Sequence, residues 1–354
     1  MRSKGASHDP GFARREVTRR DLLRPGRAPA RESQSAYDLI KASRPAMGSF
    51  FEVRLPLQLL GAADLATRAL DRVDQLEDQL TVYREVSEVS RLNASAHLGP
   101  VVVEPGLFSL LSRGIELWRQ TGGAYDLTSG ALSNAWGFTR PPRRVPSTET
   151  LAEARARTGS NLVKLDPSDH SVQFEREGVS INLGSIGKGY AIDQAAQLIR
   201  DYWLPTSALI HGGRSSLYAL GSPPDQFAGA WEVALHNPLD PERPLGTVRL
   251  RDRGLGTSGA AFQRFEEGGR LYGHIIDPRT GEPPSQGPLS VTVLAPTAAE
   301  ADALSTAFYL IGPEAASEIM RDRPALSAIF WMQGDRDGPD LITLGLAEAD
   351  FQRF

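Results

Sequence analysis

The chain has 354 residues, 40% of them hydrophobic, which is enough for one large or two ordinary domains with a real core. It contains no cysteine, so disulfides, thiolate metal sites and thiol catalysis are excluded, and its six histidines show no pair with the spacing of a helical zinc site. The formal net charge is −4, but the first 35 residues hold eight Arg and one Lys against four acids, so the remaining chain stands at −9. That balance argues against a nucleic-acid-binding body.

Residues 1–35 are expected to form a basic, disordered tail, and residues 36–354 a single domain. The tail contains Thr-Arg-Arg-Asp-Leu-Leu-Arg at 18–24, which is close to a twin-arginine export signal, but no apolar stretch follows it. No segment approaches the roughly 20 apolar residues of a membrane span. The sequence therefore favours a cytoplasmic location, with export as the alternative.

Hydrophobic periodicity predicts the elements of the domain in chain order. Residues 47–57 read as a strand, 69–80 as an amphipathic helix, and a second helix begins near Pro105 and ends at Gly122-Gly123. Residues 141–146 read as a surface loop. Further strands are predicted at 179–183, 207–210, 231–235, 246–250 and 289–294, with helices at 189–201 and 297–311. Several strands in succession favour an α+β domain built on antiparallel or mixed sheet.

The helix at 297–311 carries two polar residues on an apolar face. Thr297 and Glu300 have the spacing of a capping box, so the helix is expected to start at Thr297. Asp302 and Thr306 are then i and i+4, one turn apart. The carboxylate and the hydroxyl of such a pair either hydrogen-bond to each other or bind a ligand.

Other stretches allow a structural and a functional interpretation. Asn182-Leu-Gly-Ser-Ile-Gly-Lys-Gly leads from a predicted strand into a helix, and it is either a phosphate cradle with Lys188 as its cation or a tight turn with a solvated lysine. His274 stands beside the Asp277-Pro278 turn and is either structural or catalytic. Gly123-Ala-Tyr-Asp-Leu-Thr128 by itself reads as core.

The order of these motifs resembles the ApbE family of flavin transferases. Met47-Gly-Ser, Leu80-Thr-Val-Tyr-Arg84, the 123–128 stretch, Trp136-Gly-Phe, the 182–193 stretch, His211-Gly-Gly, Thr257-Ser-Gly, Gly273-His-Ile-Ile-Asp-Pro-Arg-Thr-Gly281 and Glu300-Ala-Asp-Ala-Leu-Ser-Thr-Ala307 follow one another over residues 40–315. The resemblance implies an ApbE-like, T-fold-like α+β domain with largely antiparallel or mixed sheets flanked by helices.

The resemblance also implies the residues of a site. In that family a magnesium ion lies against the FAD pyrophosphate, and the positions that match its protein ligands are Ser185, Ala299, Asp302 and Thr306. The positions that match the flavin and adenine contacts are Met47, Tyr83, Ala124, Tyr125, Asp126, Asn182, Lys188, His274 and Ile275. His274 and Asp302 are the implied catalytic residues, with His274 as the general base.

The implied reaction is attack by a Ser or Thr hydroxyl of an acceptor protein on the FMN phosphorus of FAD, which releases AMP. Acceptors in the family carry an Asp-x-x-Ser/Thr-Gly-Ala-Ser/Thr sequence. Two alternatives remain: an FAD pyrophosphatase with water as the nucleophile, and a flavin-binding module without catalysis. The second is motivated by Asn182, because members of the family usually have Asp there.

Overall fold

The computed structural model describes residues 38–203, 207–223, 229–240, 242–259, 263–334 and 340–354. The predicted tail at 1–35 lies outside these residues. The described helices are α1 Ala62–Leu80, α2 Glu88–Ser95, α3 Pro105–Gln120, α4 Gly130–Ala135, α5 Thr148–Ala156, α6 Gly187–Trp203 and α7 Ala298–Met320, with short 3-10 turns at Ser160–Leu162 and Glu348–Asp350. None of these helices is both long and apolar enough to cross a membrane.

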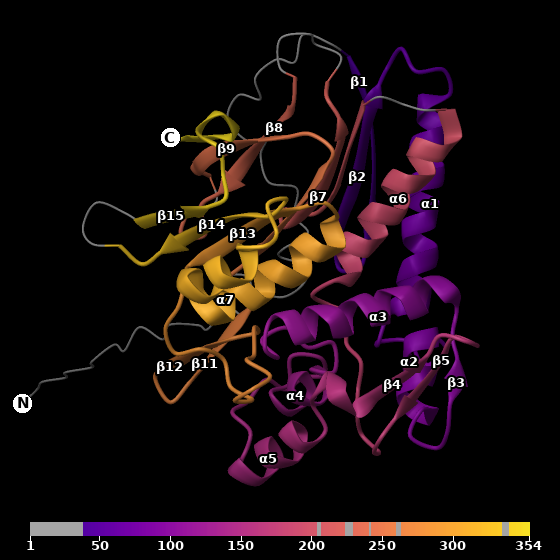
Figure 1. Ribbon diagram of the computed structural model, residues 1–354, viewed down its shortest axis with the longest axis vertical. Coiled ribbons are helices and arrows are strands. Elements are labelled where there is room, and N and C mark those ends of the chain that lie inside the picture. The colour runs from indigo at the N-terminus through magenta and orange to yellow at the C-terminus, as the bar shows by residue number, and fades with distance from the viewer. Residues whose placement is uncertain (1–37, 204–206, 224–228, 241, 260–262, 335–339) are drawn as a thin grey trace, which may run out of the picture. The chain divides into compact units, whose positions relative to one another are not determined.

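The strands of the described residues form one large sheet and three small ones (Figure 1). The eight-stranded sheet has the order β1-β2-β6-β7-β10-β13-β14-β15. Its strands are β1 Leu39–Ala46, β2 Ser49–Pro56, β6 Ser207–Gly212, β7 Ser216–Gly221, β10 Arg253–Ser258, β13 Ser290–Ala295, β14 Ser327–Met332 and β15 Asp340–Leu344. All of its strand pairs are antiparallel, as predicted.

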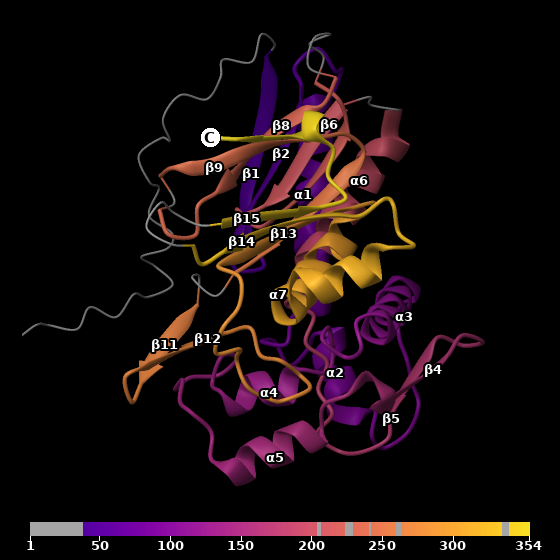
Figure 2. The same cartoon turned by 60° about the vertical axis from the view of Figure 1, so that its left-hand side comes forward.

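Three small sheets accompany the eight-stranded sheet. They are β16-β9-β8 (Phe351–Arg353, Pro244–Leu250, Trp231–His236), β3-β5-β4 (Val101–Val102, Ser171–Phe174, Val163–Asp166) and the hairpin β11–β12 (Arg264–Glu267, Arg270–Gly273). Figure 2 shows α4, α5 and the hairpin at the end of the molecule that lies away from β1.

Helices α1, α6 and α7 cover one face of the large sheet. Phe51, Val53 and Leu55 alternate along β2 and are fully buried under α1, which follows from the side-chain period of two in a strand. The other face packs around Trp231, Val248 and Trp331 against the β16-β9-β8 sheet. The sheet is therefore buried between two layers.

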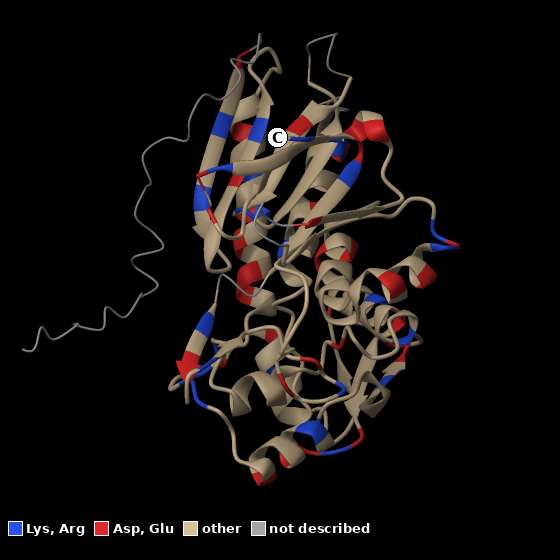
Figure 3. Cartoon of the chain, turned by 90° about the vertical axis from the view of Figure 1, so that its left-hand side faces the viewer, with Lys and Arg blue, Asp and Glu red and all other residues tan. Residues whose placement is uncertain are grey.

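Figure 3 marks the positions of charged residues along the chain, and several of them lie on strands of the large sheet. The carboxylate of Glu52 lies between the His211 ring, at 3.2 Å, and the Arg54 guanidinium, at 2.5 Å. The hydrogen bond with His211 contributes most to lowering the pKa of Glu52, to about 2, and Arg54 adds to it. This half-buried carboxylate is paired within the sheet and is therefore accounted for structurally.

The predicted elements are largely confirmed, with three corrections. The strand predicted from Met47 begins at Ser49, because Met47 and Gly48 form the turn of the β1–β2 hairpin with φ of 49° and 71°. The strand predicted at 179–183 is wrong: this extended segment makes one isolated parallel bridge, from Ser180 to Ser129. Val179, Ile181 and Leu183 alternate because they are buried in the core, although the segment does not pair with a strand of a sheet.

The third correction concerns the capping box of α7. Thr297 does cap the helix, since its hydroxyl accepts from the amide of Glu300 at 3.2 Å. The Glu300 side chain does not return to Thr297, because it is buried between the guanidinium groups of Arg113, at 2.6 Å, and Arg323. The helix is broken near its predicted end by the non-helical φ of 78° at Gly312.

Candidate functional site

Two helix N-termini meet where the predicted ligand residues lie. A Cβ on Gly189 of α6 would stand 2.3 Å from the carbonyl oxygen of Ala298, and a Cβ on Gly256 of β10 would stand 2.4 Å from the amide nitrogen of Asp302. Real Cβ atoms do not approach so closely, so glycine is required at both positions. The start of α7 thus rests backbone to backbone on α6 and β10, which fixes the position of Asp302.

Asp193 ties these two helices together. Its carboxylate accepts from the amides of Ala298 and Ala299, at 2.8 and 2.9 Å, and so caps the N-terminus of α7 from α6. Burial raises the pKa of Asp193 to about 7, against the opposing effect of these two hydrogen bonds. The sequence prediction did not include this residue, although an Asp among Ile192, Ala195 and Ile199 on an apolar helix face was an available signal.

Asp302 is a buried carboxylate with few hydrogen-bond donors. It is 7% exposed, and one oxygen accepts from the amide of Gly189 at 2.9 Å. Burial raises its pKa to about 6, while the charge of Lys188, the Ser216 hydroxyl and the Gly189 amide act in the opposite direction. A carboxylate held in this way gains from a cation placed beside it.

The Thr306 hydroxyl does not donate a hydrogen bond to the carboxylate of Asp302. Its hydroxyl lies 3.3 Å from the main-chain carbonyl of Asp302 and 3.0 Å from the hydroxyl of Ser258 on β10. Ser305 also contacts Ser258, at 2.8 Å. The two predicted ligands therefore lie on one face of α7 in a group of oxygen atoms.

Lys188 acts through its charge on two of the predicted site residues. Its ammonium donates to the hydroxyl of Ser215 at 2.5 Å, and its charge lowers the pKa of both Asp302 and His274. Ser215 and Ser216 follow the His211-Gly-Gly turn, and nothing in the sequence marked them as partners of Lys188 and Asp302. The start of α6 contacts Asp302 through the Gly189 amide, and the charge of the neighbouring Lys188 acts on both Asp302 and His274.

His274 follows the hairpin β11–β12 directly. Its Nδ1 lies 3.2 Å from the carbonyl oxygen of Gln263, which can only accept, so Nδ1 carries the proton and Nε2 keeps its lone pair. Burial is the largest cause that lowers the pKa of this ring, and the positive charges of Lys188 and Arg143 add to it. The imidazole is consequently neutral near pH 7, as a general base requires.

The turn before α6 is shaped by Asn182. Its side-chain oxygen accepts from the main-chain amide of Gly184 at 2.9 Å, and the main-chain amide of Asn182 donates to the carbonyl of Leu127 at 2.8 Å. A carboxylate could accept the same bond from Gly184, so the Asn is compatible with the turn. Ser185 follows in this turn, and its hydroxyl lies beside that of Tyr125, which is 1% exposed.

The two oxygens of Asp126 are already used by the protein. They accept from the amide and hydroxyl of Thr128, at 2.8 and 2.7 Å, and from the amide and hydroxyl of Ser160, at 3.1 and 2.8 Å. Burial still raises the pKa of Asp126. Its neighbours Ala124 and Tyr125 are buried too, so the structural interpretation of this stretch explains its contacts, and a cofactor role for it stays a prediction.

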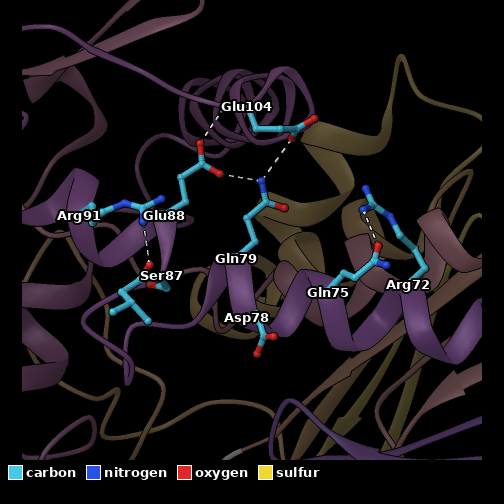
Figure 4. Close-up of a pocket in the computed structure, with 9 residues that line it drawn as sticks. Arg72, Gln75, Asp78, Gln79, Ser87, Glu88, Arg91 and Glu104 are labelled. Atoms are coloured by element: carbon cyan, nitrogen blue, oxygen red, sulfur yellow. Dashed lines mark hydrogen bonds between the residues drawn. The ribbon is translucent and has the colours of Figure 1, made fainter.

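Of the other predicted positions, Tyr83 is 62% exposed on the α1–α2 connection, Met47 is half-buried in the hairpin turn, and Ile275 is buried next to His274. The cofactor roles of Tyr83 and Met47 also stay predictions. A separate cavity of about 470 Å³ opens between α1, α2 and the start of α3 (Figure 4). There Gln79 donates to Glu88 and Glu104, and none of the predicted site residues lines it.

The donor set fits a hard cation. Among the described residues no three His, Asp or Glu side chains gather into a metal cage, whereas Asp302, Thr306 and Ser258 supply hard oxygen atoms. Mg²⁺ typically takes one or two carboxylates and fills its remaining positions with water or phosphate oxygens. A buried carboxylate, neighbouring hydroxyl oxygens, a lysine and a neutral histidine are the residue types of sites that act on phosphate esters.

Comparison with known proteins gives the family. Residues 47–330 match the sequence profile of the ApbE family. The chain is 30% identical over 296 residues to the FAD:protein FMN transferase of Escherichia coli K12, covering 82% of this chain and 83% of that one. It is 33% identical over 270 residues to the protein of the same name from Treponema pallidum, covering 73% and 74%.

Solved structures agree with this assignment. The ApbE protein of Thermotoga maritima superposes with a TM-score of 0.77 at 27% identity, covering 86% of this chain and 96% of that one. The flavin transferase ApbE of Vibrio cholerae superposes with a TM-score of 0.76 at 26% identity, covering 87% and 97%. The chain belongs to the ApbE family, and the predicted α+β fold is confirmed.

Proposed function

We propose that this chain is an FAD:protein FMN transferase. A Ser or Thr hydroxyl of an acceptor protein attacks the FMN phosphorus of FAD, the new O–P bond forms, the bond to the bridging oxygen breaks, and AMP leaves. The observation that carries the proposal is the position of Lys188, whose charge acts on both the buried Asp302 and the neutral His274. Lysine, base and carboxylate belong to one site, as phosphoryl transfer requires.

His274 takes the proton of the attacking hydroxyl. Its Nδ1–H is fixed by the Gln263 carbonyl, which leaves Nε2 as the acceptor. The lowered pKa keeps the ring unprotonated at neutral pH, so the base is ready when the acceptor arrives. A protonated ring could not serve, and activity should be lost in acid.

Lys188 and the N-terminus of α6 hold the pyrophosphate. The amides of Gly187 and Gly189 already donate to the carbonyl of Leu183, at 2.7 Å, and to Asp302, at 2.9 Å, so the lysine ammonium and the positive end of the helix dipole supply the attraction for the anion. Gly187 begins α6 and the lysine follows it directly. Tyr83, exposed on its loop, offers a ring on which the flavin stacks, and Asn182 shapes the turn that leads into α6.

The buried carboxylate of Asp302, the Thr306 hydroxyl, the Ala299 carbonyl and Ser185 are the residues that would hold Mg²⁺. When bound, the ion supplies electrophilic stabilisation of the phosphoryl oxygens and of the leaving AMP. On the protein side, burial makes Asp302 a strong partner for a cation, and Asp193 keeps the helix that carries it in place.

The experiment combines a peptide of the Asp-x-x-Ser/Thr-Gly-Ala-Ser/Thr type with the full chain, FAD and Mg²⁺. The proposal predicts FMN bound to the peptide and AMP released in equal amounts, and loss of both products in His274→Gln with FAD binding retained. Free FMN and AMP with unmodified peptide would support the pyrophosphatase instead. FAD binding without any cleavage would support a flavin-binding module.

A further inference from the structure

One face beside His274 is built from two segments far apart in the sequence. The chain from Phe138 to Val145 runs along the hairpin β11–β12, which leads directly into His274. The Arg143 guanidinium lies 3.4 Å from the carbonyl of Arg264, and the amide of Val145 donates to Glu267 at 3.0 Å. The two segments thus form one continuous surface, which we call the hairpin face.

Aromatic rings fix this face to the body of the domain. Tyr272 stacks on Phe265 with ring centroids 5.4 Å apart, and Trp136 lies 5.3 Å from Tyr272. Trp136 itself is buried and donates to the carbonyl of Gly281 at 2.8 Å. Phe265 and Tyr272 therefore hold one face of the hairpin against the domain. The opposite face is turned to solvent, where Leu271 is 57% exposed.

The hairpin face carries more positive charge than its carboxylates neutralise. Its arginines are exposed and form no ion pair with a described residue; they are Arg140, Arg143, Arg144, Arg264 and Arg270. The carboxylates of the face are Glu266, which is exposed, and Glu267, which accepts from Val145. Two exposed arginines outside this face, Arg68 and Arg321, pair with nearby carboxylates.

Arg143 is the arginine best placed with respect to the base. Its guanidinium lies 5.7 Å from the centroid of the Phe138 ring, and that ring lies edge-on to His274 at 6.4 Å. The two distances bound the separation of the guanidinium from the imidazole at about 12 Å, which an extended chain crosses in about four residues. The positive charge of Arg143 also reaches the His274 ring, whose pKa it helps to lower.

We propose that the hairpin face is the docking surface for the acceptor protein and selects an acidic, extended segment. On it Arg143 binds a carboxylate that lies within about four residues of the attacking hydroxyl. This inference rests on the proposed function, because it requires a hydroxyl of a second protein to reach His274. Charge complementarity identifies the occupant: arginines without protein carboxylates match an acidic partner, and the planar guanidinium pairs with a carboxylate through two parallel hydrogen bonds.

The test measures binding and transfer separately on the full chain with FAD and Mg²⁺. The probes are three labelled extended peptides with one Thr, which carry two Asp, two Asn or two Lys at the same positions within four residues of the Thr. Fluorescence anisotropy gives their affinities at low and high salt, and mass spectrometry gives FMN transfer. The variant is Arg143→Glu, and the control is Arg251→Glu, an exposed arginine that precedes β10.

The wild type should bind the Asp peptide at least 5-fold more tightly than the Asn peptide, with a preference that falls at high salt. Arg143→Glu should abolish that preference and improve binding of the Lys peptide, while Arg251→Glu changes neither. Because Arg143 also helps to lower the pKa of His274, FAD cleavage without peptide is followed against pH in Arg143→Glu, and its profile should shift to higher pH while the binding preference is lost at every pH.

Equal binding of the Asp and Asn peptides by the wild type would overturn the inference, and so would an Asp preference that survives in Arg143→Glu. Transfer of FMN to both peptides alike would leave the proposed function standing and remove the docking surface. Selective binding of the Asp peptide without transfer would keep the surface and remove the proposed function.

Discussion

Replacing Asp302 by Asn should stabilise the metal-free protein at neutral and alkaline pH while removing its response to Mg²⁺. The pKa of this carboxyl is 3.8 in the unfolded chain and about 6 in the folded protein, mainly because the side chain is buried. Below pH 3.8 both states hold the proton. As the pH rises through 6, the folded protein must bury a charge that the unfolded chain exposes to water, and stability is lost.

The shift sets the size of the effect. A rise of about two pKa units corresponds to about 3 kcal/mol at pH 8. Asn removes the charge and keeps an oxygen that can accept from the Gly189 amide. In EDTA, urea unfolding should therefore show Asp302→Asn about 1–3 kcal/mol more stable than the wild type at pH 8. The difference should shrink toward pH 4.

With Mg²⁺ present, the wild type should become at least as stable as Asp302→Asn. At 100 times its dissociation constant, a ligand adds about 2.7 kcal/mol to the stability of the protein that binds it. The wild type should show this gain, and Asp302→Asn should not. Asp64→Asn is the control, because Asp64 is exposed and pairs only with Arg68 on the same helix. If Asp302→Asn is less stable without metal at every pH, or if Mg²⁺ stabilises both proteins equally, the reasoning about this carboxylate is wrong.

Three further substitutions test how the site is supported. Gly189→Ala places a methyl group 2.3 Å from the Ala298 carbonyl and should cost about 1–3 kcal/mol of unfolding free energy and weaken FAD binding in calorimetry, whereas Gly99→Ala, with open space around it, should do neither. Glu300→Gln leaves Arg113 and Arg323 without their shared carboxylate and should cost about 3 kcal/mol in urea unfolding, against less than about 1 kcal/mol for the exposed Glu318→Gln; equal losses would contradict the ion-pair account. Asn182→Asp keeps the acceptor for the Gly184 amide, so it should change FAD affinity and leave the transfer rate at saturating FAD nearly unaltered, and a tenfold faster rate, about 1.4 kcal/mol of barrier, would give this position a part in the chemistry.

The sequence predicted the elements whose apolar residues repeat clearly. Helix α1 was visible because Ala69, Val73, Leu76 and Leu80 recur at helical spacing, and all four are buried. Strands β7, β10 and β14 were not predicted, because a strand in the middle of a large sheet is buried on both faces and shows no alternation. The 179–183 segment is the opposite case, because its apolar residues alternate although it is not a strand of a sheet.

The candidate site divides in a similar way. Asp302 and Thr306 were found because two polar residues on an alanine-rich helix conflict with the pattern around them. In the structure Asp302 accepts from the Gly189 amide and Thr306 contacts Ser258, and their role as metal ligands stays a prediction. Ser215 and Ser216 were not found, because their partners come from α6 and α7, and small hydroxyl residues after a glycine turn carry no signal of their own. Arg143 lies in a loop that the sequence marked only as surface, and its relation to His274 follows from the packing of Phe138.

Mass spectrometry of an acceptor peptide incubated with the full chain, FAD and Mg²⁺ tests the central claim most directly. The account predicts one FMN attached to a Ser or Thr of the peptide for each AMP released, with none in His274→Gln. Two results would contradict it, both with an unmodified peptide: FAD that is bound but stays intact, and FAD that is cleaved to free FMN and AMP.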